Sequence, residues 1–449
     1  MNNTFPDHFI FGTATASYQI EGAVSEGGRG PSVWDTHCHS TQKVQHGHSG
    51  DIACDHYHRY EEDLDLIANL GCQAYRFSIA WSRLIPDGDG AINPEGIAFY
   101  HRVIDGLLAR GIEPWITLFH WDLPQSLEDR YGGWRSRKTA EAFGRYAGIV
   151  ADEYSTKVRH FFTMNEFDCF TDKCYYRGEF APAHHVSAKE AFQVRHNALL
   201  GHGMAVQSLR RHAKQEILVG LAENPKLTVP VIASNANIEA ARTAFRKINE
   251  RFLSPILDGG YTDDYLAEFS DDTPEFTTAD FELISAPLDF IGLNMYTPCI
   301  VEADPESQHG FRQIPLSHSH PNMHVGWLKM GPEVAYWASR FMAEIWDVPK
   351  IYISENGCSG SDNVVINGQI KDTDRILYLR HYLLWASQAV AEGYPLHGYF
   401  LWSLMDNFEW NDGYSERFGL VHVDYATQER TPKLSYDFYS KLIKTRQIH

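Results

Sequence analysis

Short apolar runs recur along the chain, each bounded by polar or turn-forming residues. They span residues 8–16, 72–81, 112–121, 158–166, 216–224, 288–296, 350–357 and 396–402. The runs are rich in Ile, Val, Phe and Tyr, and they are apolar on both faces instead of alternating with polar residues. This pattern is typical of strands in a parallel sheet that is covered by helices on both sides.

Segments with helical periodicity separate these runs, and several carry recognisable end signals. Asn93 and Pro94 predict the start of a helix that ends near Gly111, and Ser187 with Glu190 has the spacing of a capping box. Strand and helix therefore alternate along the whole chain. Eight such units predict the α/β class and a closed (β/α)8 TIM barrel.

The chain is longer than a minimal barrel, so the additional residues are expected in long βα loops. The longest polar stretches cover residues 36–56, 223–250 and 302–330, and we expect loops there. No Ser/Gly-rich linker, low-complexity tract or internal repeat divides the 449 residues. Residues 1–449 are therefore predicted to form a single domain.

The charge balance narrows the choice of partners. With 58 acidic and 39 basic residues the net charge is −19, which disfavours nucleic acid and anionic membrane surfaces, so a small neutral molecule is expected. No export signal opens the chain, and the seven cysteines form no even framework, so cytoplasmic residence is predicted. The sequence makes no prediction about oligomeric state.

Polar and aromatic residues stand where the predicted strands end. In a TIM barrel the carboxyl ends of the strands carry the chemistry. The residues at these ends are His120, Trp121, Asn165, Glu166, Asn294, Tyr296, Glu355, Asn356 and Trp402. Glu166 and Glu355 belong to strands that lie roughly across the barrel from each other, and two carboxyl groups that flank one bond are what glycosidic cleavage requires.

The stretch Met405–Trp410, "MDNFEW", follows the last predicted strand and combines two carboxylates with two aromatic rings. A surface loop has little use for Phe and Trp, and a core has no place for unpaired carboxylates. The combination suits a pocket with flat apolar walls and charged acceptors.

Six motifs in the same chain order resemble the signature stretches of family 1 glycoside hydrolases, the β-glucosidases. They read "FGTATASYQIEG", "SVWDT", "RFSIAWSR", "TMNE", "ISENG" and "SLMDNFEWNDGYSERFGL", and they extend from residue 11 to residue 420. The resemblance implies a retaining β-glycosidase in which Glu166 is the acid/base and Glu355 is the nucleophile. It requires no cofactor and no metal.

The resemblance also implies which residues bind the substrate. Those that match the first sugar site of the family are Gln19, His120, Asn165, Asn294, Tyr296, Trp402, Glu409 and Trp410. Trp327 matches a tryptophan of the aglycone site, and Asn165 is expected to meet the 2-hydroxyl. Asp406 is assigned to structure.

The two catalytic carboxyl groups need different protonation states. Arg76 resembles the arginine beside the nucleophile of the family, so we expect it to keep Glu355 ionised, and the charge of Glu355 then raises the pKa of Glu166. The family continues "NE" with Pro and Trp, whereas Phe167 and Asp168 follow here. Because those positions face the leaving group in similar enzymes, Asp168 is expected to alter aglycone preference.

The implied activity is hydrolysis of terminal β-D-glucosyl residues from cellobiose, short oligosaccharides or aryl β-glucosides, in carbohydrate metabolism that includes cellulose and polysaccharide degradation. β-Galactosides or β-fucosides are expected to be accepted as well. One alternative is a 6-phospho-β-glucosidase. An ionised Glu409 would repel the phosphate of such a substrate, and relatives acting on phosphosugars lack this glutamate. The other alternative is a non-catalytic sugar-binding barrel.

A histidine-rich loop supplies the best competing signal. His37, His39, His46, His48, His56 and His58 surround two cysteines. A metal-dependent barrel hydrolase would need imidazoles at strand ends. These histidines follow the first strand in a loop instead, so no metal site is predicted.

Overall fold

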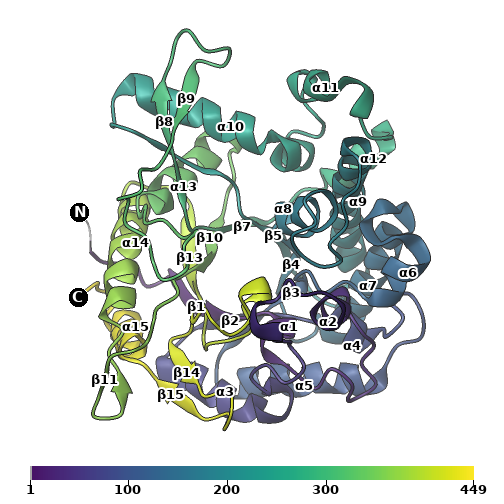
Figure 1. Cartoon of the computed structure of the whole chain (residues 1–449), viewed down its shortest axis with the longest axis vertical. Coiled ribbons are helices and arrows are strands. Elements are labelled where there is room, and N and C mark those ends of the chain that lie inside the picture. Colours follow the sequence, from purple (N-terminus) through teal and green to yellow (C-terminus); the bar gives the residue numbers. More distant parts are fainter. Residues whose placement is uncertain (1–2) are drawn as a thin grey trace.

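A closed barrel of parallel strands forms the centre of the computed structural model, which describes residues 3–449 (Figure 1). The strands are β1 (Ile10–Ala14), β2 (Ala74–Ser78), β3 (Glu113–Phe119), β4 (His160–Asn165), β5 (Leu218–Glu223), β7 (Phe290–Asn294), β10 (Ile351–Asn356) and β13 (Leu396–Trp402). Each lies within one of the eight predicted apolar runs. Every strand pairs with its neighbour in chain order, and β13 closes the barrel on β1. The predicted TIM barrel is confirmed.

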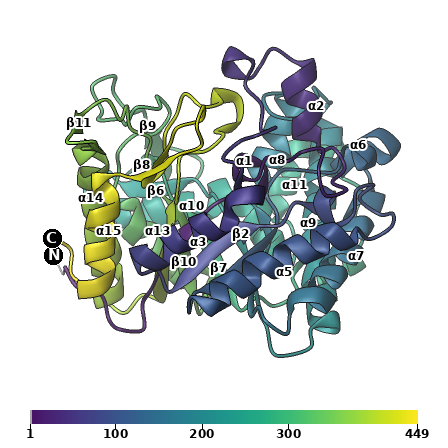
Figure 2. The same ribbon diagram turned by 90° about the horizontal axis from the view of Figure 1, so that it is seen from below.

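Long helices surround the barrel (Figures 1 and 2). They are α3 (His56–Leu70), α5 (Pro94–Ala109), α7 (Arg137–Tyr154), α9 (Ala188–His212), α10 (Asn235–Leu257), α13 (Val334–Trp346), α14 (Thr373–Ala391) and α15 (Leu434–Thr445). The predicted end signals are confirmed: Asn93 accepts a hydrogen bond from the backbone of Glu95, and Ser187 with Glu190 forms a capping box. In the described part of the chain no helix is long and apolar enough to cross a membrane.

Short helices, single turns and minor sheets lie outside the barrel sheet. The short helices are α1 (Ser17–Ile20), α2 (Val33–Ser40), α4 (Trp81–Leu84), α6 (Gln125–Tyr131), α8 (Phe167–Phe170), α11 (Asp263–Phe269) and α12 (Thr278–Ile284). Single turns are η1 (Gln45–Gly47), η2 (Gly133–Arg135), η3 (Asp172–Tyr176), η4 (Ser270–Asp272) and η5 (Trp410–Asp412). The minor sheets contain β6 (Leu227–Pro230), β8 (Pro298–Ala303) and β9 (Phe311–Ile314); β11 (Val365–Ile366) and β12 (Gln369–Ile370); β14 (Val421–Val423) and β15 (Arg430–Pro432).

The expectation of a loop over residues 223–250 is wrong for most of that stretch. Residues 227–230 form β6, and α10 begins at Asn235 after a Ser234 cap. The helix is rich in polar residues, but its small and aromatic residues, including Ala241 and Phe245, are buried along one face. An amphipathic helix of this kind has low mean hydropathy, which hides it from a search for apolar runs.

Aromatic rings fill the barrel interior around Trp115. Trp115 of β3 lies within 6.0 Å, measured between ring centroids, of Phe162, Phe290, Tyr352 and Phe400, which come from four other strands. The barrel is therefore a packed core at this level, and space for a ligand remains only toward the carboxyl ends of its strands.

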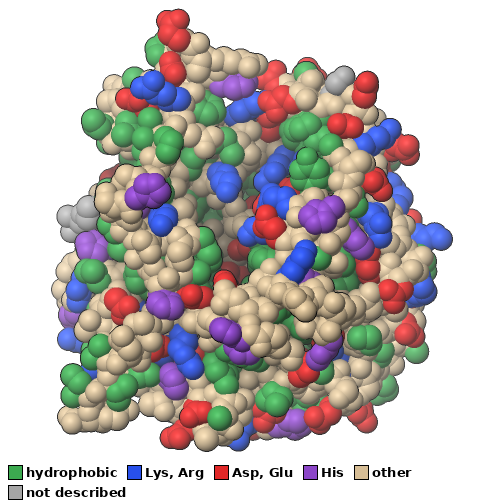
Figure 3. Space-filling view, in the orientation of Figure 1, with side chains coloured by type: hydrophobic (Ala, Val, Ile, Leu, Met, Phe, Trp, Pro, Cys, Tyr) green, Lys and Arg blue, Asp and Glu red, His purple; other side chains and the backbone are tan. Residues whose placement is uncertain are grey.

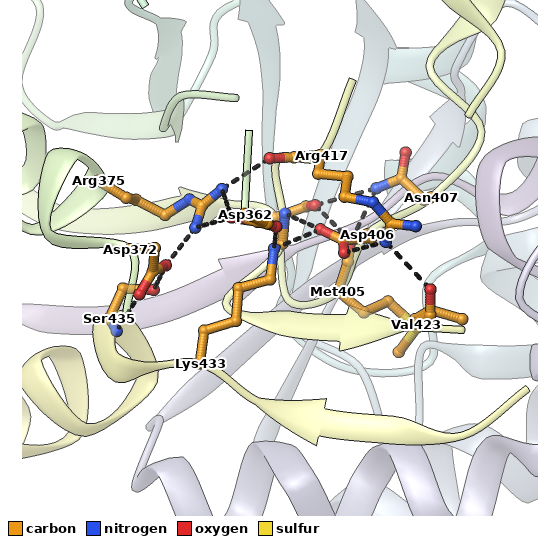
Figure 4. A network of polar contacts seen from close by, with 12 residues as sticks. Asp362, Asp372, Arg375, Met405, Asp406, Asn407, Arg417, Val423, Lys433 and Ser435 are labelled. Atoms are coloured by element: carbon orange, nitrogen blue, oxygen red, sulfur yellow. Dashed lines mark hydrogen bonds and ion pairs between the residues drawn. The ribbon is translucent and has the colours of Figure 1, made fainter. Parts of the chain in front are cut away.

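A buried ionic network holds the segment that follows β13 (Figure 4). Asp406 is fully buried and accepts bonds from Lys433 and Arg417, both at 2.7 Å, and from the backbone N–H of Gly419 at 3.0 Å. Lys433 also pairs with Asp362 at 2.5 Å. These contacts confirm the structural assignment of Asp406, because each of its carboxylate oxygens is used within the network.

We expect Asp406→Ala to lower the free energy of unfolding by about 3–5 kcal/mol, because it leaves the buried ammonium of Lys433 short of a counter-charge. Urea titration followed by tryptophan fluorescence measures the change. The control is Glu429→Ala on the exposed side of the same region, which should stay within about 0.5 kcal/mol of the wild type. A loss below about 1 kcal/mol for Asp406→Ala would contradict a supporting role for the network.

Candidate active site

Glu166 and Glu355 line one cavity at the carboxyl end of the barrel. Glu355 belongs to β10, and Glu166 directly follows β4 with a φ of 55°. Both are buried, at 6% and 3% exposure, and the cavity has a volume of about 540 Å³. A left-handed backbone at a glutamate is strained, and strain of this kind is found most often at functional sites.

A chain of hydrogen bonds joins the two carboxyl groups through the wall. Arg76 donates from Nη1 to Oε1 of Glu355 at 2.8 Å and from Nη2 to Oδ1 of Asn165 at 2.6 Å. Asn294 donates from Nδ2 to Asn165 Oδ1 at 3.0 Å and to Oε1 of Glu166 at 2.6 Å. Because arginine can only donate, the Asn165 amide must turn its oxygen toward Arg76. This orientation fixes the donors and acceptors in the rest of the hydrogen-bond chain.

Glu355 has contacts that favour its charged form. In addition to Arg76, the hydroxyl of Tyr296 donates to its Oε2 at 3.0 Å. Burial nevertheless raises the pKa of Glu355 to about 7, and the neighbouring Glu166 adds to this rise while Arg76 opposes it. Arg76 therefore contacts Glu355 and lowers its pKa in the predicted direction, but desolvation of the carboxylate raises the pKa by more.

Glu166 is held by neutral donors. Asn294 donates to one oxygen, and the other oxygen accepts from Asn224 Nδ2 at 3.2 Å and from the Cys169 thiol at 3.1 Å. The sequence analysis missed Asn224 and Cys169. Asn224 could have been found, because it ends the fifth apolar run in the same way that Asn165 and Asn294 follow theirs. Cys169 lies in a short helix and carried no recognisable signal.

His120 lines the cavity and has one ring N–H without a partner among the described residues. Asn165 Nδ2 donates to His120 Nε2 at 3.2 Å, so the ring proton is on Nδ1. Burial and the charge of Arg76 lower the pKa of His120 well below its usual range, which keeps the ring neutral. Nδ1 is buried and has no partner among the described residues, and the same holds for Gln19 Oε1 and Asn224 Oδ1. Unsatisfied polar atoms of this kind are places where a polar ligand or an ordered water can bind.

Most of the predicted sugar-binding residues come together. The cavity wall contains His120, Asn294, Tyr296, Trp327, Trp402, Glu409 and Trp410 together with both carboxyl residues. Trp327 stands at the mouth and is 49% exposed. Gln19, Asn165 and Arg76 lie behind this wall, where Gln19 donates to Glu409 Oε2 at 3.3 Å.

Carboxylates crowd the end of the cavity around Trp410. Burial and the nearby charges of Asp412, Glu355 and Glu166 raise the pKa of Glu409 well above its usual range. Burial and these neighbouring charges therefore oppose the ionised form of Glu409 that the sequence analysis assumed. The four carboxyl groups repel one another, so protons are retained among them.

The carboxylate of Asp168 is paired with two arginines. It pairs with Arg251 at 2.7 Å and with Arg177 at 2.8 Å. Burial favours its neutral form, but the two arginines outweigh that effect and hold the pKa of Asp168 well below its usual range. Phe167 is buried and stacks on Phe252. The two arginines pair with the Asp168 carboxylate, and the effect of Asp168 on aglycone preference stays a prediction.

The loop histidines engage separate partners. His56 bonds Asp63 at 2.7 Å, His37 bonds Asn411 at 3.2 Å, and His48 accepts from the backbone of Tyr414. Among residues 3–449, no group of three or more His, Cys, Asp or Glu side chains is arranged to hold a metal ion.

A (β/α)8 barrel with two buried carboxyl groups in a polar and aromatic cavity has the features of a glycosidase. The model of glycosyl hydrolase family 1 matches residues 1–448. The chain is 41% identical to Beta-glucosidase A of Acetivibrio thermocellus over 98% of each chain, and 42% identical to Beta-glucosidase of Agrobacterium sp. over 98% of this chain and 95% of the relative. The chain belongs to glycosyl hydrolase family 1 and is a hydrolase.

Solved structures agree with this assignment. The family 1 β-glucosidase from Thermotoga maritima superimposes with a TM-score of 0.90 at 38% identity, covering 100% of both chains. The same enzyme is known in complex with deoxynojirimycin, with a TM-score of 0.90, and with galacto-hydroximolactam, with a TM-score of 0.91, each at 38% identity over 100% of both chains.

We expect the carboxyl group of Glu355 to titrate near pH 7, and at a higher pH in Tyr296→Phe, because the lost hydroxyl favoured the charged form. The 13C NMR signal of labelled glutamate δ-carbons, assigned with Glu355→Gln, measures this midpoint. Tyr131→Phe is the control, since its hydroxyl bonds Asp89 instead. A midpoint near the ordinary value of about 4.3 would show that burial does not dominate.

Proposed function

We propose that this protein is a retaining β-glucosidase that removes terminal β-D-glucosyl residues from cellobiose, short oligosaccharides or aryl β-glucosides. The observation that carries the proposal is the pair of buried carboxyl groups in one cavity, linked through Arg76, Asn165 and Asn294. The unpartnered atoms of His120, Gln19 and Asn224 support a ligand rich in hydroxyl groups. The aromatic walls support stacking on a sugar face.

In the proposed first step, Glu355 attacks the anomeric carbon while Glu166 gives its proton to the departing oxygen. Arg76 and Tyr296 favour charge on Glu355, and the neutral donors around Glu166 are compatible with a protonated acid. The pair shares one proton in this state. A glycosyl-enzyme forms, and the negative charge of Glu355 disappears.

In the second step Glu166 is the base. Having given its proton to the leaving group, Glu166 is ionised, and it accepts a proton from water as the water attacks the anomeric carbon and the bond to Glu355 breaks. The sugar leaves with its original configuration, and both carboxyl groups return to their starting states. Asn165 belongs to the proposal as the residue that meets the 2-hydroxyl, through the second N–H of its amide nitrogen, because Arg76 and Asn294 already occupy its amide oxygen.

The other elements of the proposal have more limited support. β-Galactosides or β-fucosides are included because the Thermotoga maritima enzyme binds a galacto-configured compound. The free cysteines support cytoplasmic residence. Hydrogen bonding of Phe5 to Arg446 ties the two ends together and supports one domain over the whole chain. A contribution to cellulose and polysaccharide degradation follows only if cellobiose is a substrate.

A 6-phospho-β-glucosidase is less well supported. Glu409 and Asp412 line the end of the cavity near Trp410, and the lysines on the described wall, Lys173 and Lys226, are beside the segments that follow β4 and β5. A phosphate near Glu409 would meet acidic groups whatever the protonation state of Glu409. The presence of both carboxyl residues likewise disfavours a non-catalytic sugar-binding barrel.

We expect Glu355→Gly to abolish hydrolysis of 4-nitrophenyl β-glucoside and azide to restore product in the form of the α-glucosyl azide, because a small anion can occupy the emptied nucleophile position. Chromatography and NMR of the product measure its anomeric configuration. Glu429→Gly, at an exposed site, is the control and should not respond to azide. Formation of the β-azide would contradict the role of Glu355.

We expect the wild type to hydrolyse 4-nitrophenyl β-glucoside with a kcat/KM at least about a hundredfold above that of its 6-phosphate, and Glu409→Ser to narrow this ratio. Glu429→Ser is the control, since Glu429 is exposed and does not line the cavity. A wild type that prefers the phosphorylated substrate would overturn the proposed glucoside specificity.

A further inference from the structure

Two lysines on the cavity wall are without a counter-ion. Lys173 belongs to the turn η3, and Lys226 lies between β5 and β6. Both line the main cavity, and both also line a side chamber of about 90 Å³ next to it. Lys173 Nζ lies 4.9 Å from the ring centroid of Phe180. Within residues 3–449, neither ammonium group has a carboxylate oxygen within ion-pair distance.

The arginines around this chamber are already neutralised. Arg251 pairs with Asp168 and Asp172, and Arg177 pairs with Asp168 and Glu179. Asp168 therefore forms its ion pairs with arginines. The two lysines remain as unpaired cations of this wall among the described residues. The wall also borders Glu166, because Asn224 lines the chamber and bonds Glu166 at 3.2 Å.

Lys173 is half-buried, and it remains charged. The neighbouring Cys169 sulfur and the carboxylates of Glu166 and Asp168 raise its pKa, against the effect of burial. A charged group held partly away from water favours an anionic partner. Figure 3 shows basic side chains around the central hollow of this face.

A simpler explanation is that the lysines only offset the acidic field of the cavity. That explanation fits their proximity to Glu166, and to Asp168 and Glu223, which line the same side chamber. The two explanations predict different results. If the lysines act only through the general field on Glu166, their removal changes the rate for every substrate. A binding site for an anion changes only the ratio between anionic and neutral substrates of the same shape.

We propose that the leaving-group side of the cavity accepts an aglycone that carries a carboxylate or a similar oxyanion, bound between Lys173 and Lys226. The inference rests on the proposed function, in which Glu166 protonates the leaving group and therefore borders the aglycone. The aromatic rings of Phe180 and Trp327, which line the same cavity, supply apolar surface for the body of the aglycone. The preferred substrate class is then an acidic aryl β-glucoside.

The test compares 4-carboxyphenyl β-glucoside with 4-carbamoylphenyl β-glucoside, which has nearly the same shape and no charge. The carbamoyl group withdraws electrons more strongly than the carboxylate, so leaving-group chemistry alone favours the neutral substrate. We expect the ratio of kcat/KM, carboxylate over amide, to be at least about tenfold at low salt and to fall at 0.5 M NaCl, because salt screens exposed charges.

Variants assign this preference to the lysines. Lys226→Gln and Lys173→Gln should each reduce the ratio several-fold, and Lys226→Arg should retain it because the charge remains. Lys441→Gln removes the same charge from the exposed surface of α15 and should leave the ratio unchanged. Circular dichroism checks that each variant is folded, and the amide substrate is the internal reference for every variant.

The outcomes separate this inference from the proposed function. A ratio near or below one in the wild type, with both glucosides hydrolysed, overturns the anionic aglycone and leaves the β-glucosidase intact. A high ratio that is the same in Lys226→Gln and Lys173→Gln overturns the assignment to these lysines. A protein that hydrolyses neither glucoside nor 4-nitrophenyl β-glucoside overturns the proposed function and the inference together.

Discussion

The buried guanidinium of Arg76 is the interaction on which the site depends. Arg76 is 1% exposed and donates to Thr117, Ser354, Glu355 and Asn165, so one side chain of β2 reaches the interior of β3, β4 and β10. A cation in this position is tolerated because each of its three nitrogens donates to an acceptor. The same bonds determine how Asn165 points, and through it the proton position on His120.

The electrostatics of the cavity follow from placing several acids around one cation. Arg76 cannot neutralise Glu166, Glu355 and Glu409 together, so burial and mutual repulsion raise the pKa values of Glu355 and Glu409. A shared proton among neighbouring carboxyl groups is useful for a reaction that needs one acid and one base. Beside Glu166, Asp168 pairs with Arg251 and Arg177, whereas Lys173 and Lys226 line the cavity without a carboxylate at ion-pair distance among the described residues.

Support for this cavity comes from a second ionic cluster outside it. Asp406 anchors the start of the "MDNFEW" segment to Lys433 and Arg417, and four residues later Trp410 reaches the cavity. Trp410 has a φ of 51°, and its ring lies 4.4 Å from that of Trp121 and 4.6 Å from that of Trp34. The strained backbone is held by ring packing on one side and by the buried charges on the other.

The sequence by itself determined the elements whose signals are local. Apolar runs located all eight barrel strands, the caps at Asn93 and Ser187 located helix starts, and strand-end polarity pointed to Glu166 and Glu355. The tertiary structure decided what depends on several distant residues at once: the direction of Asp168, the pKa values of Glu355 and Glu409, and the contacts of Asn224 and Cys169 with Glu166. The physical reason is that strand and cap formation depend on neighbours along the chain, whereas desolvation and charge pairing depend on neighbours in space.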